Sequence, residues 1–270
     1  MNETLKDSVR EFWNAKSCGE VYAEGESPAE KLEQQARERY IREPGIHEFA
    51  GFSDGAGRDV LEIGVGMGAD HLEWAKSAPR SLTGIDLTER AIQFTQERLA
   101  YYGLHSDLRV ADAEKLPFAA DSFDIVYSYG VLHHSPDTAQ AIREVRRVLR
   151  PGGSARIMIY HSHSLVGYML WLRYGLLAGK PQQSLREIYA HHLESPGTKA
   201  FSESEARAML SSFSSVDIRT VLGPGDLLEG LVGQRHRGIL LGVAKALWPR
   251  WFIRSAMKKH GLTMLIDAVK

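Results

Sequence analysis

The sequence is short of cysteine. Its 270 residues contain a single one, Cys18, which excludes a framework of intrachain disulfides and a cysteine-built metal site. One thiol is typical of a reducing compartment, so we expect a cytoplasmic protein. Long apolar runs are missing as well, because no stretch reaches the roughly 18 apolar residues of a transmembrane helix. The charged start, MNETLKDSVREFWN, has no apolar signal core, so we expect no secretory peptide.

A large net charge of either sign is also lacking. The 33 Lys and Arg residues nearly balance the 34 Asp and Glu residues, so the molecule as a whole is not expected to attract polyanions. The balance is uneven along the chain, because eight basic residues face one acid, Asp267, between Gly230 and Lys270. This basic region has too little aromatic interleaving for a single-stranded nucleic-acid platform, and we expect no nucleic-acid partner.

What the chain does have is a regular alternation of strand and helix patterns. We expect helices at 3–15 and 28–41, strands at 58–65, 81–87, 106–113, 123–130 and 154–161, and helices at 69–77, 88–103 and 137–150 between the strands. A helix at 202–212, a strand at 214–221 and an apolar stretch at 261–269 follow. Strands separated by single helices require right-handed crossovers. The sequence therefore predicts an α/β fold with a doubly wound, Rossmann-like, seven-stranded, mostly parallel sheet.

Alternating glycines follow the first strand in DVLEIGVGMGAD, residues 59–70. Ligands of such sheets bind beyond the carboxyl ends of the strands, where Gly64, Gly66 and Gly68 lie. Glycine allows a tight turn and lets a ligand touch the backbone. With Ala69 and with Asp86 about 20 residues further on, the segment also satisfies a dinucleotide pattern, so NAD is one candidate ligand. Glycines that serve only turn and helix packing are the other explanation.

Further residues at successive strand ends decide between these readings. The chain carries, in order, Glu62 in LEIGVGMG, Asp86 in GIDLT, Asp112 in VADAEKLPF, then FDIVYSYGVLHH and LRPGG. This set resembles the class I S-adenosylmethionine-dependent methyltransferases, in particular the small-molecule branch that methylates quinones, sterols and natural products. The resemblance covers residues 50–161. Where methylases of nucleic-acid bases and of protein glutamine have an NPPY-like segment, this chain has SYGVLHH, which argues against those activities.

The resemblance implies a cofactor, S-adenosyl-L-methionine, and positions for it. The glycine loop, Gly64, Gly66 and Gly68, would meet the methionine part, Asp86 the ribose hydroxyls, and Asp112 with Ala113 the adenine. Leu87, Tyr129 and His133 would also line the cofactor site. Glu62 suits a ligand that carries a positive sulfonium better than it suits a pyrophosphate. Met67 is bulkier than the residue usual at its position in the family.

The catalytic needs of methyl transfer are small, because the sulfonium already activates the methyl group. A general base is needed only for an acceptor that arrives protonated, and histidine is the usual choice near neutral pH. The candidates follow the fourth and fifth strands: His133, Tyr160, His161 and His163. His133 is as readily explained as a structural histidine. The spacing of His, Asp and Glu residues gives no convincing metal site, so we expect no metal.

Two segments interrupt the alternation and are expected to select the acceptor. We divide the chain into a helical cap (1–50), a cofactor-binding core (51–161), a helical insert that covers the acceptor (162–200) and the remainder of the sheet (201–270), which includes a basic, apolar insert (222–260). Residues 164–180 are apolar with two charges, Arg173 and the terminal Lys180, and residues 235–260 mix basic and apolar side chains. Both suit a lid over a lipophilic or aromatic small molecule, or contact with a membrane surface.

Three hypotheses remain from the sequence. The first is an S-adenosylmethionine-dependent methyltransferase that acts on a small acceptor by in-line displacement. The second is a nicotinamide-dependent oxidoreductase on the same kind of sheet. The third is a membrane-associated binding module with an inactive cofactor site. The sequence leaves open the acceptor, the methylated atom and the oligomeric state.

Overall fold

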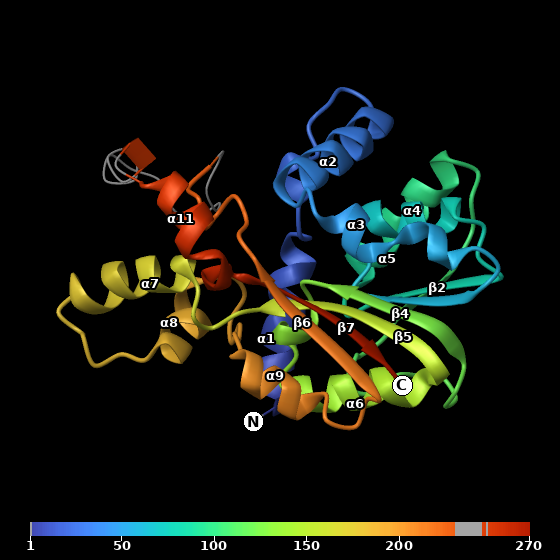
Figure 1. The fold of residues 1–270 in the computed structure, drawn as a ribbon. Helices are drawn as coiled ribbons and strands as arrows, with labels where there is room; N and C mark the ends of the chain where they lie inside the picture. Colours follow the sequence, from blue (N-terminus) through green and yellow to red (C-terminus); the bar gives the residue numbers. More distant parts are fainter. Residues whose placement is uncertain (1, 230–244, 247) are drawn as a thin grey trace.

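Seven strands form one sheet in the computed structural model, which describes residues 2–229, 245–246 and 248–270 (Figure 1). Their order is β3-β2-β1-β4-β5-β7-β6. The strands are β1 (Asp59–Ile63), β2 (Ser81–Asp86), β3 (Asp107–Val110), β4 (Phe123–Tyr129), β5 (Leu149–Tyr160), β6 (Ser215–Val221) and β7 (Thr263–Val269). The first five are parallel, and β7 lies antiparallel between β5 and β6. The predicted seven-stranded, mostly parallel sheet is confirmed.

The helices follow the predicted alternation with one exception. They are α1 (Asn2–Ala15), α2 (Pro28–Arg42), α3 (Ile46–Ala50), α4 (Ala69–Lys76), α5 (Glu89–Tyr101), α6 (Thr138–Val148), α7 (Leu165–Trp171), α8 (Leu185–His192), α9 (Glu203–Met209) and α11 (Arg250–Ala256). Residues 111–122, between β3 and β4, contain no helix, and the sequence prediction placed none there. The exception is the short helix α3, which the sequence prediction missed.

The cap helix α2 begins where its sequence predicts. Ser27 accepts a hydrogen bond from the Glu30 amide, and the Glu30 carboxylate accepts one from the Ser27 amide, which together form a capping box. Pro28 occupies the first turn, where its missing N–H costs nothing. This local sequence fixes the start of the helix that lies over the glycine loop.

The core lies on both faces of the sheet, because β1 is buried along its whole length. Leu61 and Ile63 pack on the face covered by α6, whereas Val60 packs on the other face with Trp74 of α4. Side chains of a strand alternate between faces, so one apolar strand serves two layers. Because β1, β2 and β3 are parallel neighbours, their carboxyl ends meet at one edge of the sheet.

The inserts form a separate group of short helices beside the sheet (Figure 1). Leu165 of α7 and Ile253 of α11 share a small apolar cluster with Leu227. A π-helical turn, η4 (Leu172–Leu176), continues α7. The predicted basic, apolar insert falls partly on residues 230–244 and 247, which lie outside the described residues. Across the described part of the chain, no helix combines the length and apolar character needed to span a bilayer.

Candidate active site

The glycine loop begins where β1 ends. Gly64 has φ 86°, a conformation that disfavours residues with a side chain. A Cβ at Gly64 would also lie 2.1 Å from Cγ2 of Val131, in the loop after β4. Gly64 therefore allows two strand ends to approach each other, which is a packing role.

Gly66 differs from Gly64 in its surroundings. Its φ is 54°, yet a Cβ there would meet no atom within 4 Å. Its amide donates to Asp86 Oδ2 at 3.2 Å. The predicted cofactor contact requires open space in front of the Gly66 backbone and a carboxylate beside it, here that of Asp86. Gly68, the third glycine, caps α4.

Asp86 at the end of β2 is held by its neighbours as well as by Gly66. Its Oδ1 accepts from the Thr88 amide at 3.0 Å and from the Thr88 hydroxyl at 2.9 Å. Burial raises the pKa of this carboxyl, and the hydrogen bonds from Thr88 and Gly66 oppose the rise. The half-buried Leu87 follows it directly. The fold thus brings Asp86, the predicted ribose ligand, next to the glycine loop.

Glu62 does not face the loop as a free anion. Its carboxyl lies 2.9 Å from His71 Nδ1 in a fully buried pair. The other ring nitrogen of His71 lies 2.8 Å from Ser106 Oγ, which gives its own hydrogen to the Leu82 carbonyl and so accepts from the ring. Burial raises the pKa of Glu62 and lowers that of His71 to about 3. The proton shared between the carboxyl and Nδ1 therefore lies on Glu62, and both groups are neutral. That Glu62 contacts the cofactor stays a prediction.

Asp112, the predicted adenine ligand, follows β3 and is reached by the cap. Its Oδ2 lies 2.5 Å from Lys6 Nζ of α1, and the same ammonium lies 2.8 Å from Glu114 Oε2. Ala113 packs against the core. The cap helix α1 is therefore attached to the edge of the sheet where the adenine is expected.

Tyr129, at the end of β4, is joined to the cap by residues that the sequence reasoning missed. Its hydroxyl donates to Glu43 Oε2 at 2.9 Å, and the Arg39 guanidinium lies over its ring, 5.5 Å from the centroid. Arg39 also forms a two-bond ion pair with Asp70, the acid after the glycine loop, and Tyr127 donates to Asp70 at 2.8 Å. Nothing in the sequence marked Arg39 or Glu43, because their partners are distant in the chain.

His133, in the loop after β4, and Tyr160, the last residue of β5, lie next to each other. Their ring centroids are 4.0 Å apart. His133 is 0% exposed, and neither of its ring nitrogens has a hydrogen-bond partner among the described residues. Burial, with the neighbouring His134 and Lys199, holds its pKa well below the usual range, so the ring is neutral. The Tyr160 hydroxyl donates to Glu194 Oε2 at 2.8 Å, a residue of the insert that the sequence did not single out.

His161 and His163 lie beside a different part of the fold. The ring of His161 is buried, and its Nδ1 contacts the Gly261 carbonyl at 3.2 Å. Burial lowers the pKa of this histidine. His163 is exposed and contacts Ser162 Oγ at 3.0 Å. These contacts give His161 a structural explanation, and the catalytic role of either residue stays a prediction.

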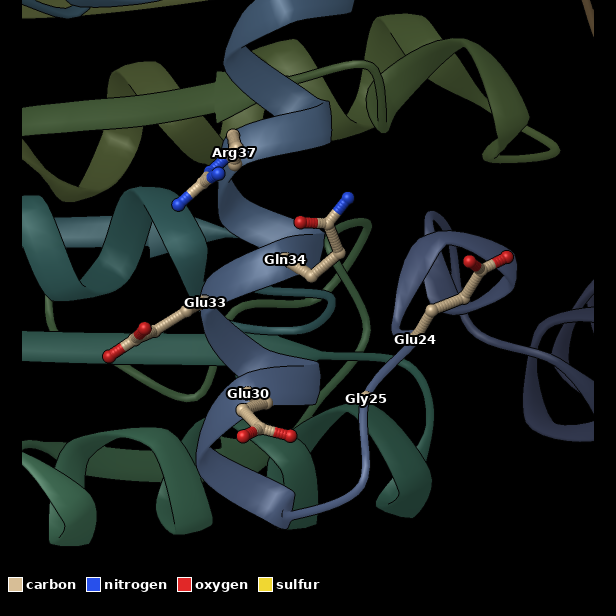
Figure 2. A pocket seen from close by; sticks show the side chains of 6 residues that line it. All are labelled: Glu24, Gly25, Glu30, Glu33, Gln34 and Arg37. Carbon is tan, nitrogen blue, oxygen red and sulfur yellow. The ribbon is translucent and has the colours of Figure 1, made fainter.

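The described surface also has a groove away from these residues. Figure 2 shows it between α2 and the preceding loop, with side chains that point outward from the helix. Its lining is Glu24, Gly25, Glu30, Glu33, Gln34 and Arg37. The groove is polar, mainly acidic, and contains none of the predicted site residues, so we do not assign the reaction to it.

Comparison with known proteins identifies the core. Residues 61–157 match the family model described as Methyltransferase domain. The match covers the core and not the remainder of the chain. The resemblance to class I S-adenosylmethionine-dependent methyltransferases is thereby confirmed for the core, since the matched residues include the glycine loop and both strand-end aspartates.

Curated relatives of this methyltransferase domain match over the same region. The 27-O-demethylrifamycin SV methyltransferase of Amycolatopsis mediterranei is 39% identical over 102 residues, which are 36% of this chain and 37% of the relative. A probable phthiotriol/phenolphthiotriol dimycocerosates methyltransferase of Mycobacterium ulcerans is 41% identical over 109 residues, 40% of this chain and 41% of the relative. The chain therefore matches about two fifths of the length of these relatives.

Solved structures share the fold over more of the chain. A chain from the Haloferax volcanii complex that contains the Trm112 methyltransferase activator has a TM-score of 0.60 at 18% identity and covers 97% of both chains. An S-adenosylmethionine-dependent methyltransferase from Mesorhizobium loti has a TM-score of 0.53 at 17% identity, with 84% of this chain and 97% of that chain covered. Likeness at this level of identity shows the fold alone.

Proposed function

We propose that this protein transfers a methyl group from S-adenosyl-L-methionine to a small, lipophilic or aromatic acceptor. The observation that carries the proposal is the Gly66 backbone, which is open on one side and bonded to Asp86 on the other, within a methyltransferase domain. Activity and acceptor are proposed for the whole protein, because the relatives match only its core.

The residues present fit the cofactor. Open space lies in front of Gly66, and carboxylates of Asp86 and Asp112 lie at the ends of adjacent strands. Both acids suit a ligand that offers hydroxyl and amino groups and carries a positive sulfur. Leu87 and Ala113 follow these acids in the chain and provide apolar surface. A nicotinamide dinucleotide is the weaker proposal, since the core matches a methyltransferase model.

The cofactor, when bound, supplies an activated methyl group on its sulfonium. The protein has to align the acceptor atom with the sulfur–methyl bond and to exclude water, and orientation of this kind is worth roughly 7–11 kcal/mol. The insert residues near β5 suit this task, because Glu194 reaches the Tyr160 hydroxyl. His133 is the candidate to accept a proton from a protonated acceptor, because burial keeps its ring neutral.

The inserts support a lipophilic acceptor. The names of two relatives mention 27-O-demethylrifamycin SV and phthiotriol/phenolphthiotriol dimycocerosates. Large apolar side chains are exposed on the inserts: Leu177 is 72% exposed and Trp251 is 77% exposed. Arg250 and Arg254 are on the same helix as Trp251. We include in the proposal a peripheral contact of this surface with anionic lipid, from which a lipophilic acceptor would enter.

Calorimetry with S-adenosylmethionine and with S-adenosylhomocysteine tests the cofactor. We expect both to bind, and no binding of either at millimolar concentration would reject the proposal. Incubation with isotopically labelled cofactor and cell extract, followed by mass spectrometry, then identifies the product that has gained the methyl group. Enhanced NADH fluorescence on mixing, with no methyl transfer, would support the oxidoreductase instead.

Sedimentation with vesicles tests the lipid contact separately. Trp251→Ser is expected to reduce binding to vesicles that contain phosphatidylglycerol and to leave cofactor affinity unchanged. A matched control is Tyr101→Ser, an exposed aromatic residue at the end of α5. Equal sedimentation of the wild type and both variants would contradict a lipid contact through Trp251.

A further inference from the structure

Three metal-ligating side chains converge beside the predicted methyl-transfer site. His133 and His134 are in the short helix η3 (Leu132–His134) after β4, and Glu194 follows α8 in the insert. One donor atom from each can be chosen so that all three lie within 4.8 Å of one another. His134 Nε2 and Glu194 Oε2 are 3.4 Å apart. Small movements of these side chains would bring two imidazole nitrogens and one carboxylate oxygen into contact with a single ion.

His133 supplies an independent observation. Its side chain is completely buried and neither ring nitrogen has a hydrogen-bond partner in the described part of the chain. A buried polar group without a partner is costly, so native proteins rarely leave one. An ion held between the three donor atoms would give a ring nitrogen of His133 the partner that it lacks among the described residues.

The hydrogen bonds around the cluster prepare His134 as a ligand. The Thr198 hydroxyl donates to the Ser195 carbonyl at 2.7 Å, so the lone pairs of Thr198 Oγ1 are available to Nδ1 of His134 at 3.2 Å. Ser195 Oγ lies 2.8 Å from the same nitrogen. When Nδ1–H donates to these oxygens, Nε2 presents its lone pair toward Glu194. Oxygen acceptors that orient a histidine in this way are typical of metal sites.

Glu194 is oriented as well, because the Tyr160 hydroxyl donates to its Oε2. Its side chain is 34% exposed, which leaves an entry path from solvent. Lys199, among the described residues, opposes a cation here: it lies close enough to His133 to affect it, although its ammonium is held by the carbonyls of Ser135 and Pro136 at 2.6 and 2.8 Å. The carboxylate of Glu194 offsets this charge.

We propose that His133, His134 and Glu194 bind one divalent transition-metal ion, with Zn²⁺ as the probe. Nitrogen-rich sets favour Zn²⁺ and its first-row neighbours, whereas Mg²⁺ and Ca²⁺ prefer oxygen ligands. Three protein ligands leave a coordination position open, as in catalytic zinc sites. The ion ties the insert, through Glu194, to the end of β4. This inference goes beyond the proposed methyl transfer and does not depend on it.

Calorimetry with ZnCl₂ on chelator-treated, cofactor-free protein tests the site. We expect one Zn²⁺ per chain, with Glu194→Gln and His133→Ala each weakening binding by at least tenfold. MgCl₂ is expected to produce no saturable heat. The matched control is His191→Ala, an exposed histidine on the neighbouring helix α8, which should bind Zn²⁺ like the wild type.

Absorption of the Co²⁺-loaded protein provides a readout that a merely structural role would not change. The intensity of the visible bands reports coordination number, and it should fall in Glu194→Gln while circular dichroism shows the same fold. Zn²⁺ affinity that is equal in the wild type, Glu194→Gln and His133→Ala, or absent from all of them, would overturn the site. S-adenosylmethionine binding, measured on the same zinc-free sample, reports the proposed function separately.

Discussion

Lys6 and Asp112 are 106 positions apart in the sequence, yet Lys6 Nζ and Asp112 Oδ2 lie 2.5 Å from each other. The side chains are partly buried, with 18% and 30% of their surface exposed. The ion pair attaches the first helix of the cap to the strand end that is predicted to bind adenine. The cap is therefore attached by an ion pair to the predicted adenine site.

The first prediction concerns this link. Lys6→Ala is expected to speed the dissociation of S-adenosylmethionine and to weaken its binding severalfold, because a partly exposed ion pair contributes up to about 1 kcal/mol. Stopped-flow displacement measures the rate. Arg10→Ala is the matched control, since Arg10 pairs only with the exposed Asp7 of the same helix among the described residues. Equal rates in the two variants would mean that α1 does not retain the cofactor.

The core of the fold could be predicted from the sequence because its signals are local. Apolar strands, the Ser27 cap and the glycine loop each act within a few residues. The partners of Glu62 and Asp112 could not be predicted in the same way. His71 meets Glu62 only when α4 packs on the sheet, and Lys6 meets Asp112 only when the cap helix α1 packs there. Glu194 was missed for a related reason: it lies in an insert without a motif, and only the fold brings it to Tyr160.

Gly64 and Gly66 should respond differently to the same substitution. Gly64→Ala is expected to destabilise the fold by about 2–4 kcal/mol, because backbone strain at φ 86° adds to a clash with Val131. Val131→Ala in the same chain should restore part of this loss. Gly66→Ala meets no atom, so only strain of about 1–2 kcal/mol is expected, together with weaker cofactor binding. Denaturant unfolding and calorimetry measure the two effects. A larger stability loss for Gly66→Ala would contradict these roles.

Asp86 is predicted to bind the ribose. Asp86→Ala should weaken S-adenosylmethionine binding by roughly 1–3 kcal/mol, the scale of hydrogen bonds to a charged group. Because Asp86 also accepts from Gly66 and Thr88, some stability is lost as well, and affinity should be measured below the unfolding transition. Asp107→Ala, at the exposed start of β3, serves as the control. An unchanged dissociation constant in Asp86→Ala would place the ribose elsewhere.

The pair of Glu62 and His71 makes stability depend on pH. The raised pKa of Glu62 gives stability that is present below its ordinary value of 4.5 and is lost as pH rises. The pKa of His71, lowered from 6.5 to about 3, gives the opposite dependence between those two values. The two effects cancel between pH 4.5 and 6.5. Above 6.5 only the Glu62 effect remains, so the free energy of unfolding should fall.

Glu62→Gln tests this account. Its amide donates to His71 Nδ1 as the protonated carboxyl does, but it does not titrate. Urea unfolding from pH 6 to 9, without cofactor, should therefore show a flatter profile for the variant than for the wild type. Glu73→Gln, whose partner is the exposed Lys76, should keep the wild-type slope. Parallel profiles for the wild type and Glu62→Gln would show that the carboxyl is ionised at neutral pH.

The ion pair between Arg39 and Asp70 should be the most sensitive polar contact in the described part of the chain. Asp70 is buried and accepts from Arg39 and Tyr127, so Asp70→Asn leaves the guanidinium without its counter-charge. Breaking a buried pair on one side typically costs about 3–5 kcal/mol. Replacement of both partners, Arg39→Met with Asp70→Leu, should recover stability relative to Asp70→Asn, because no uncompensated charge remains. A double variant as unstable as the single one would mean that Asp70 acts mainly through Tyr127. Because Arg39 lies over Tyr129, cofactor affinity should still be reduced in the double variant even where stability returns.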